Sequence, residues 1–224
     1  MKNKRGLFWI ITGLLLIVAA LSLTAFNLIL EHRAGAAAED ALTQLEAQIL
    51  TRPVEQSLPV IENPSEIPAI PTEPVSPEET EIPDFILNPE MEMPVKNLNG
   101  IDYIGILQIP ALELTLPICS QWSYTLLQSA PCRYEGTAYQ NDLILMAHNY
   151  DSHFGRLKEL DMGEMIFFTD VDENTFIYQV SARETLMPTA VEEMSGGDWP
   201  LTLFTCTLGG ANRVTVRCEL VGVN

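Results

Sequence analysis

The stretch WPLTLFTCTLGGANRVTVRC, residues Trp199–Cys218, alternates apolar and polar side chains on both sides of a double glycine. This alternation predicts two β-strands, and Gly209 and Gly210 predict the turn between them. Cys206 ends the first strand and Arg213 begins the second. Because cysteine is usually a small buried hydrophobe, core packing is the default interpretation of this thiol.

Strand-like alternation extends through the whole region from about Asn97 onward. It is found in residues 103–109, 112–118, 142–148, 164–170, 175–186, 201–206 and 213–220, and short helical patterns are found in residues 123–130 and 153–160. Many short strands with few helical stretches in ~130 residues predict an all-β fold, arranged as a closed or nearly closed antiparallel barrel.

A long apolar segment lies near the N-terminus of the sequence. Residues 6–30 carry no charge, and ~20 such residues suffice to cross a bilayer as a helix. The run is longer than the ~7–15 apolar residues of a signal peptide, which favours an uncleaved anchor. Small residues around 34–38 leave cleavage open as the alternative. Lys2, Lys4 and Arg5 precede the run and predict a cytoplasmic N-terminus, with the remaining chain extracellular.

The sequence therefore divides into four parts. A basic tip with a transmembrane anchor (1–33) is followed by an amphipathic juxtamembrane helix (34–52), whose leucines recur at helical spacing. Residues 53–96 repeat proline between acidic residues, which predicts a disordered linker that holds the last part, a catalytic or binding domain (97–224), away from the membrane. The alternative is a lid, formed by residues 85–87 folding over a groove.

The charge of the chain excludes one class of partner. The net charge is −18, whereas nucleic-acid binding needs clustered lysine and arginine, so we expect no nucleic-acid partner. No paired CxxC or HExxH spacing is present, and we expect neither a cofactor nor a metal. A metal site built from His148, Asp151, His153 and Cys206 is the competing chemistry.

Two other side chains, a histidine and an arginine, could give Cys206 a chemical role. Of the three histidines, His32 lies beside the anchor, while His148 ends a strongly apolar strand at what would be the barrel rim. An imidazole within hydrogen-bond reach makes a thiol a competent nucleophile, and a guanidinium can stabilise the oxyanion of a tetrahedral intermediate. Cys206, His148 and Arg213 supply these three groups.

Several separate motifs agree with one known family. TLFTC, residues 202–206, fits the TLXTC motif of sortases, the membrane-anchored cysteine transpeptidases of Gram-positive bacteria. IGILQIPALELTLPI resembles the opening strands of sortases, AHNYDSHFGRL the segment with the family's histidine, and NRVTVRC the strand with its arginine. The resemblance covers roughly residues 100–221, and the order of histidine, cysteine and arginine is the family's order.

The resemblance implies a fold and roles for particular residues. It implies a sortase-like eight-stranded β-barrel with Cys206 as nucleophile and His148 and Arg213 as its catalytic partners. Thr205 matches a position that shapes the substrate-binding site. Arg217 lies on the same strand face as Arg213 by period-two counting and is its rival, or else a solvated or salt-bridged barrel residue.

The resemblance also implies a reaction and partners. Cys206 would attack an LPXTG-like sorting signal near the C-terminus of a secreted protein, and an amine of a cell-wall precursor or a pilin would resolve the thioester. The subclass stays unassigned. A noncatalytic extracellular barrel that binds a peptide or wall component is the alternative, and a thiol oxidoreductase would need a close CxxC pair, which the sequence lacks.

The remaining cysteines and histidine have simpler interpretations. Cys218 alternates with apolar residues and is expected in the core. Cys119 and Cys132 are close enough in sequence for an extracellular disulfide, although two free thiols fit equally well. His153 precedes Phe154 and is expected to be a surface or packing residue.

Overall fold

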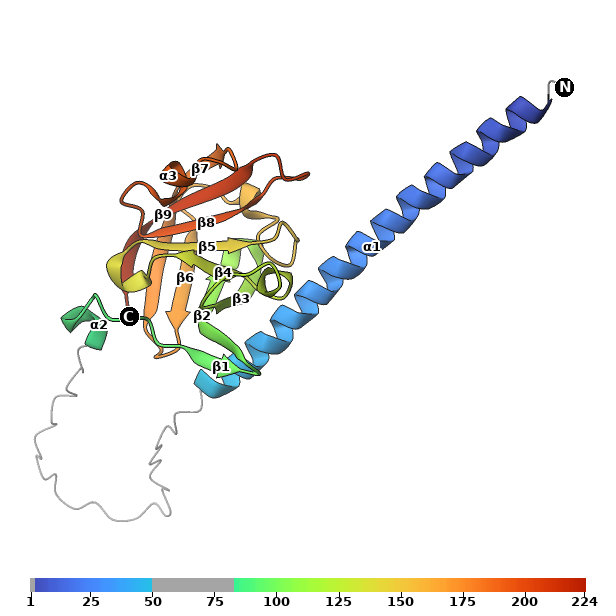
Figure 1. The fold of residues 1–224 in the computed structure, drawn as a ribbon. Helices are drawn as coiled ribbons and strands as arrows, with labels where there is room; N and C mark the ends of the chain where they lie inside the picture. Colours follow the sequence, from blue (N-terminus) through green and yellow to red (C-terminus); the bar gives the residue numbers. More distant parts are fainter. Residues whose placement is uncertain (1–2, 50–82) are drawn as a thin grey trace, which may run out of the picture.

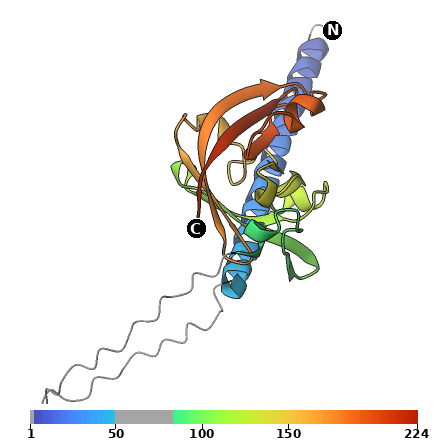
Figure 2. The ribbon, with the colours of Figure 1, turned by 90° about the vertical axis from the view of Figure 1, so that its left-hand side faces the viewer.

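The computed structural model describes residues 3–49 and 83–224, which form a β-barrel and a long helix that projects away from it toward the N-terminus (Figure 1). In the view turned by 90°, the helix runs past the barrel, which it contacts at β1 and β3 (Figure 2). The strands are β1 (Lys96–Leu98), β2 (Ile101–Ile109), β3 (Leu114–Cys119), β4 (Cys132–Glu135), β5 (Leu143–Ala147), β6 (Met165–Asp170), β7 (Thr175–Leu186), β8 (Leu201–Cys206) and β9 (Arg213–Val223). The helices are α1 (Asn3–Ile49), α2 (Asp84–Leu87) and α3 (Val191–Ser195), with 3₁₀ turns η1 (Pro110–Leu112), η2 (Leu126–Gln128), η3 (Ala138–Gln140) and η4 (Leu157–Glu159).

The sheet closes on itself. Its strands follow the order β1-β2-β3-β4-β5-β8-β9-β7-β6, and β6 also pairs with β2, so that eight strands form a ring and β1 is added to β2. Gly105 in β2 lies at the closure, where a Cβ atom would lie 2.1 Å from the carbonyl oxygen of Thr169. Only glycine permits this approach. The eight-stranded barrel expected from the sequence is confirmed.

The barrel is not wholly antiparallel, and this part of the expectation is wrong. β3 pairs with β4, and β5 pairs with β8, in the parallel direction. Parallel neighbours need a long crossover. The chain between β5 and β8 supplies one, because it contains β6, β7 and α3. A period-two pattern marks a strand but carries no information about its direction.

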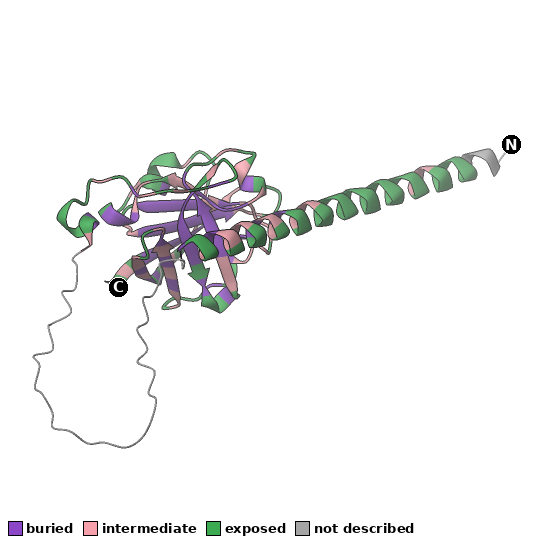
Figure 3. Ribbon diagram, turned by 90° about the horizontal axis from the view of Figure 1, so that it is seen from below, coloured by how far each residue is buried: buried purple, intermediate pink, exposed green. Residues whose placement is uncertain are grey.

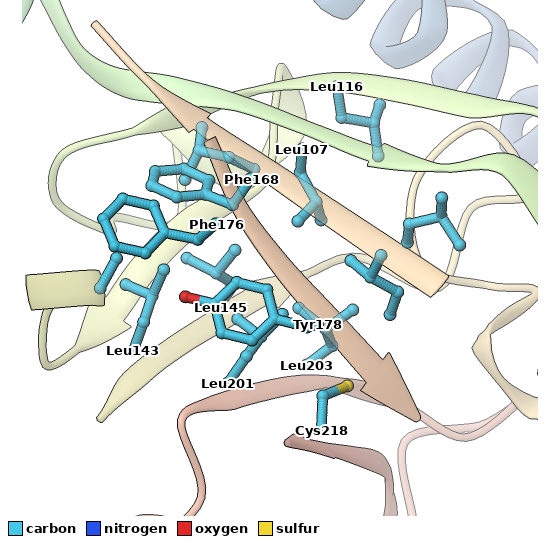
Figure 4. Close-up of a cluster of buried hydrophobic side chains, with 14 of the residues drawn as sticks. Leu107, Leu116, Leu143, Leu145, Phe168, Phe176, Tyr178, Leu201, Leu203 and Cys218 are labelled. Carbon is cyan, nitrogen blue, oxygen red and sulfur yellow. The ribbon is translucent and has the colours of Figure 1, made fainter. Parts of the chain in front are cut away.

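The barrel interior is filled by the alternate residues of its strands (Figure 4). Leu143 and Leu145 of β5 meet Leu201 and Leu203 of β8, and all four are fully buried. A fully buried leucine contributes ~1.5–3 kcal/mol relative to an exposed one. Cys218 of β9 joins the same cluster, as its alternation predicted.

α1 joins two parts that the sequence suggested were separate. It runs without a break through residues 33 and 34, and the part after residue 33 packs against β1 and β3. Ala34, Ala38, Leu45 and Ile49 are buried there. The first part of α1 is exposed and apolar (Figure 3), and it is long enough to cross a membrane.

The predicted linker lies mostly outside the described residues. Its described end, residues 83–95, packs on the barrel instead of remaining free. Phe85 of α2 is buried and stacks on Tyr139 at 4.6 Å between ring centroids, and it also contacts Phe176 at the start of β7. This is the end of the barrel away from Cys206, so in this structure Phe85 does not cover the rim where Cys206 lies.

Candidate functional site

The three predicted catalytic residues come together at one end of three neighbouring strands. β5 and β8 run in parallel, and Ala147 of β5 lies opposite Thr205 of β8. The next residue is His148 after β5 and Cys206 in β8. β9 pairs with β8 in the opposite direction, with Arg213 directly opposite Cys206. Neighbouring strands lie ~4.8 Å apart, so the register alone brings the three side chains to one rim.

Alternation places the thiol on the outside of the barrel. Leu203 and Thr205 of β8 face the interior, and Phe204 and Cys206 therefore face outward. His148, which directly follows the neighbouring strand β5, faces outward as well. Cys206 and His148 are half-buried, in contrast to the three other cysteines, which are buried. The default interpretation of Cys206 as a core residue is therefore wrong.

The β8–β9 turn fixes the position of the arginine relative to the thiol. Gly209 and Gly210 have φ angles of +82° and +76°, a region that strongly favours glycine. The turn is closed by a hydrogen bond from the Thr207 N–H to the Asn212 carbonyl (2.9 Å). Nη1 of Arg213 donates to the carbonyls of Gly210 (3.2 Å) and Asn212 (3.1 Å), which holds the guanidinium beside the rim.

The imidazole of His148 lies in a partly apolar setting. Burial lowers the pKa of His148, so the neutral imidazole is favoured. Its ring lies 5.1 Å from that of Tyr150, and its carbonyl accepts a hydrogen bond from the Phe154 N–H (3.2 Å). A neutral imidazole can accept a proton from a neighbouring thiol.

A pocket of about 160 Å³ lies on the same outer face, and of the three residues Arg213 lines it. Met146 and Phe204, each two residues before His148 or Cys206, form part of its lining, and Arg213 contributes to its edge. The other lining residues are Tyr134, Met187, Pro188, Ala190, Val191 and Met194. The pocket is thus mainly apolar and is bounded by α3 and the loop before it.

Comparison with known proteins assigns the family. The family model described as sortase domain matches residues 107–221. The chain belongs to the sortase family.

Solved sortase structures resemble the chain over part of its length, and no curated protein matches it. Sortase C from Clostridium perfringens SM101 is 25% identical, with a TM-score of 0.48, covering 54% of this chain and 71% of the other. Sortase C2 of Group B Streptococcus pilus island 1 is 27% identical, with a TM-score of 0.47 and coverage of 54% and 74%. Sortase A from Corynebacterium diphtheriae is 21% identical, with a TM-score of 0.49 and coverage of 60% and 64%.

Thr205 is buried in this sortase, with 3% of its surface exposed. Its hydroxyl donates to the carbonyl of Ala147 at 2.8 Å. This bond links β8 to β5 one residue before Cys206 and His148. The side chain therefore points away from the outer face on which the pocket lies.

Arg217 occupies a different environment from Arg213 on the same strand. Its side chain is buried, and its Nε forms an ion pair with Glu184 at 2.9 Å. Its two terminal nitrogens donate to the carbonyls of Met194 and Glu193 in α3. These contacts match the salt-bridged interpretation of Arg217, and they use the donors that a substrate would need.

The residues proposed for a metal do not form a cluster. Among the described residues, no group of three His, Cys, Asp or Glu side chains could hold a metal ion. His153 is fully buried beside Phe154, in agreement with a packing role. Cys119 and Cys132 are opposite each other in β3 and β4 as free thiols.

The walls of the pocket were not predicted from the sequence. Met194 comes from α3, whose five residues are too few to show helical periodicity. Met146 and Phe204 could have been found, because residues two positions before a rim residue share its face of the strand.

Proposed function

We propose that this protein is a membrane-anchored cysteine transpeptidase, which cleaves an LPXTG-like sorting signal and transfers the secreted protein to an amine of the cell wall or of a pilin. The observation that carries this proposal is the register of three strands, which gathers Cys206, His148 and Arg213 at one rim. The adjoining apolar pocket supports it, because a leucine or proline side chain of a sorting signal fits such a lining.

The first step forms a thioester between the enzyme and the substrate. The sulfur of Cys206 attacks a backbone carbonyl of the sorting signal, and the thiol proton passes to the neutral imidazole of His148. The lowered pKa of His148 supports this assignment, since the neutral form can take up the proton. His148 then gives the proton to the departing amine as the peptide C–N bond breaks, and this acid–base assistance is worth ~10²–10⁴-fold.

Arg213 stabilises the charge that develops on the substrate oxygen. Its guanidinium is held through Nη1 by the turn carbonyls, and within the described part of the chain its Nε and Nη2 groups remain available to the oxyanion. The second half of the reaction reverses the first: an amine attacks the thioester, His148 accepts its proton and returns it to the sulfur, and a new amide bond forms.

We assign Thr205 a positioning role in this site. Its hydroxyl bonds the β5 backbone next to His148, and its burial separates it from the pocket. Thr205 would then affect substrate binding indirectly, because its hydrogen bond sets the spacing between β5 and β8.

The apolar part of α1 supports a membrane location for the enzyme. We propose a single membrane pass with the N-terminus in the cytoplasm and the barrel outside, on the basis of Lys2, Lys4 and Arg5 before the span. The secreted substrate and the amine acceptor would meet the enzyme at the outer face of the membrane.

The test uses the full chain in detergent micelles with a panel of quenched fluorogenic Leu-Pro-X-Thr-Gly peptides and triglycine as the amine. We expect cleavage with formation of the triglycine adduct, and an acyl group on Cys206 detectable by mass spectrometry. Cys206→Ala should lose both products. Cys218→Ala is the matched control, because this thiol is buried away from the rim, and it should keep the acyl-enzyme.

Two results would contradict the proposal. An acyl group on another cysteine would exclude Cys206 as the nucleophile. Peptide binding that is unchanged in Cys206→Ala, with no cleavage by the wild-type chain, would favour the noncatalytic binding barrel.

A further inference from the structure

The part of α1 just beyond the apolar run contacts the loop that directly follows His148. We call residues 149–155, which directly follow His148, the His148 loop. Oε1 of Glu31 accepts a hydrogen bond from the backbone N–H of Asp151 at 3.0 Å. Glu31 is the first residue after the uncharged run, so this contact joins the end of the anchor to the loop.

Small residues allow the helix and the loop to approach closely. Ala34 and Ala38 are 1% and 2% exposed, and Ala38 belongs to the main core cluster. A Cβ atom at Gly35 would lie 3.1 Å from Cβ and 3.3 Å from Oγ of Ser152. Because this is tighter than ordinary van der Waals contact, a larger side chain at position 35 would push the loop away from the helix.

The His148 loop is coupled in turn to the imidazole. The N–H of Phe154 donates to the carbonyl of His148, and Phe154 itself is fully buried in the core. Ring contacts continue from His148 to Tyr150 (5.1 Å) and from Tyr150 to His153 (5.6 Å). The loop thus has few independent ways to move without moving His148.

We propose that α1 is a structural part of the active centre, in which Glu31 and Gly35 are positioning residues that hold the His148 loop and thereby keep the imidazole opposite Cys206. This inference rests on the proposed transpeptidase function. It means that the helix that anchors the enzyme also sets the geometry of its histidine. A misplacement of ~1 Å in such a group can cost on the order of 10²-fold in rate.

The test compares full-length variants in detergent micelles with the fluorogenic peptides and triglycine. Glu31→Ala removes the acceptor, and Gly35→Leu forces the helix away from Ser152. We expect kcat to fall about tenfold or more while KM stays within about twofold, because neither α1 nor residues 149–155 line the pocket proposed for the peptide. Arg33→Ala and Thr43→Leu are the controls and should retain wild-type kcat, because both positions are exposed on the same helix and lie outside the groove that Glu31 and Gly35 form with the His148 loop.

Hydrogen exchange gives a readout that does not depend on activity. In Glu31→Ala and Gly35→Leu, peptides that cover residues 149–155 should exchange faster than in the wild type, since the Asp151 N–H loses its partner or the loop loses its support. Unchanged exchange and unchanged kcat would overturn the inference and leave the proposed function intact. A wild-type chain that never turns over the peptides would overturn the proposed function, and the exchange result would still decide whether α1 holds the loop.

Discussion

Cys206 differs from the other cysteines through its place on a strand. Cys119, Cys132 and Cys218 are 0–1% exposed, whereas Cys206 is half-buried on the outer face. A hydrogen bond with Cys119, followed by burial, raises the pKa of the Cys132 thiol. Burial and, to a smaller extent, the charge of Glu219 raise the pKa of Cys218 to about 12. Since the thiolate is the reactive form, these thiols are protected both sterically and electrostatically.

Iodoacetamide at neutral pH should therefore label the folded chain once, at Cys206, and mass spectrometry identifies the site. The unfolded chain should take four labels, as all four cysteines are free. Cys206→Ala should take none when folded. Only two labels after unfolding would reveal a disulfide between Cys119 and Cys132, and rapid labelling of either in the folded chain would show that their burial is wrong.

The two arginines of β9 differ because a neighbouring helix covers one of them. Arg213 and Arg217 share the outer face of the strand, as period two required, but α3 covers only the second of them. α3 is held by this arginine and by a hydrogen bond from Ser195 to Glu135 at 2.7 Å. The short helix thereby separates a buried structural arginine from one that remains at the rim.

We expect the two arginines to affect different measurements. Arg217→Met should lower the free energy of unfolding by about 2–4 kcal/mol, since the partly exposed Glu184 and the carbonyls of Glu193 and Met194 lose their donor. Arg213→Met should leave stability within ~0.5 kcal/mol but lower kcat ~10²-fold or more. Urea unfolding and peptide turnover check the pair. Equal stability losses would contradict the separate roles, as would a normal kcat in Arg213→Met.

The sequence was informative where elements are long enough to show a period. Each segment with strand-like alternation lies on an observed strand, whereas β1, with three residues, and β4, with four, were missed. The rim positions of Cys206, His148 and Arg213 could be predicted, because they follow from strand ends. Pairing directions could not, nor could the packing of α1: the small residues around 34–38, which resembled a cleavage site, instead allow the helix to contact the barrel.

At the scale of the whole molecule, His153 links the barrel to the anchor helix. It is fully buried, and burial together with the nearby His148 lowers its pKa to about 4. The Ala34 backbone opposes this shift, although neither ring nitrogen makes a hydrogen bond of ordinary geometry within the described residues. The folded protein therefore keeps the imidazole of His153 neutral where the His148 loop meets α1.

This burial makes stability depend on pH in a definite direction. As pH falls from ~6.5 to ~4, the unfolded chain protonates His153 while the folded chain does not, so stability falls by up to about 3 kcal/mol. His153→Leu should flatten the curve in this window, as measured by urea unfolding of the full chain in micelles. His32→Leu, at an exposed position on α1, should keep the wild-type slope. A parallel curve for His153→Leu would show that another group is responsible.

The packing of α1 on the barrel also changes the outcome of a proteolytic cut in the proline-rich sequence. Leu45 and Ile49 lie in one hydrophobic cluster with Leu98, Cys119 and Cys132, and Phe85 rejoins the barrel at its far end. The segments on both sides of the proline-rich sequence are thus each held on the barrel by noncovalent packing. A single cut there would leave two fragments that still assemble, so under the proposed membrane anchoring the barrel would stay with its anchor until the helix also dissociated.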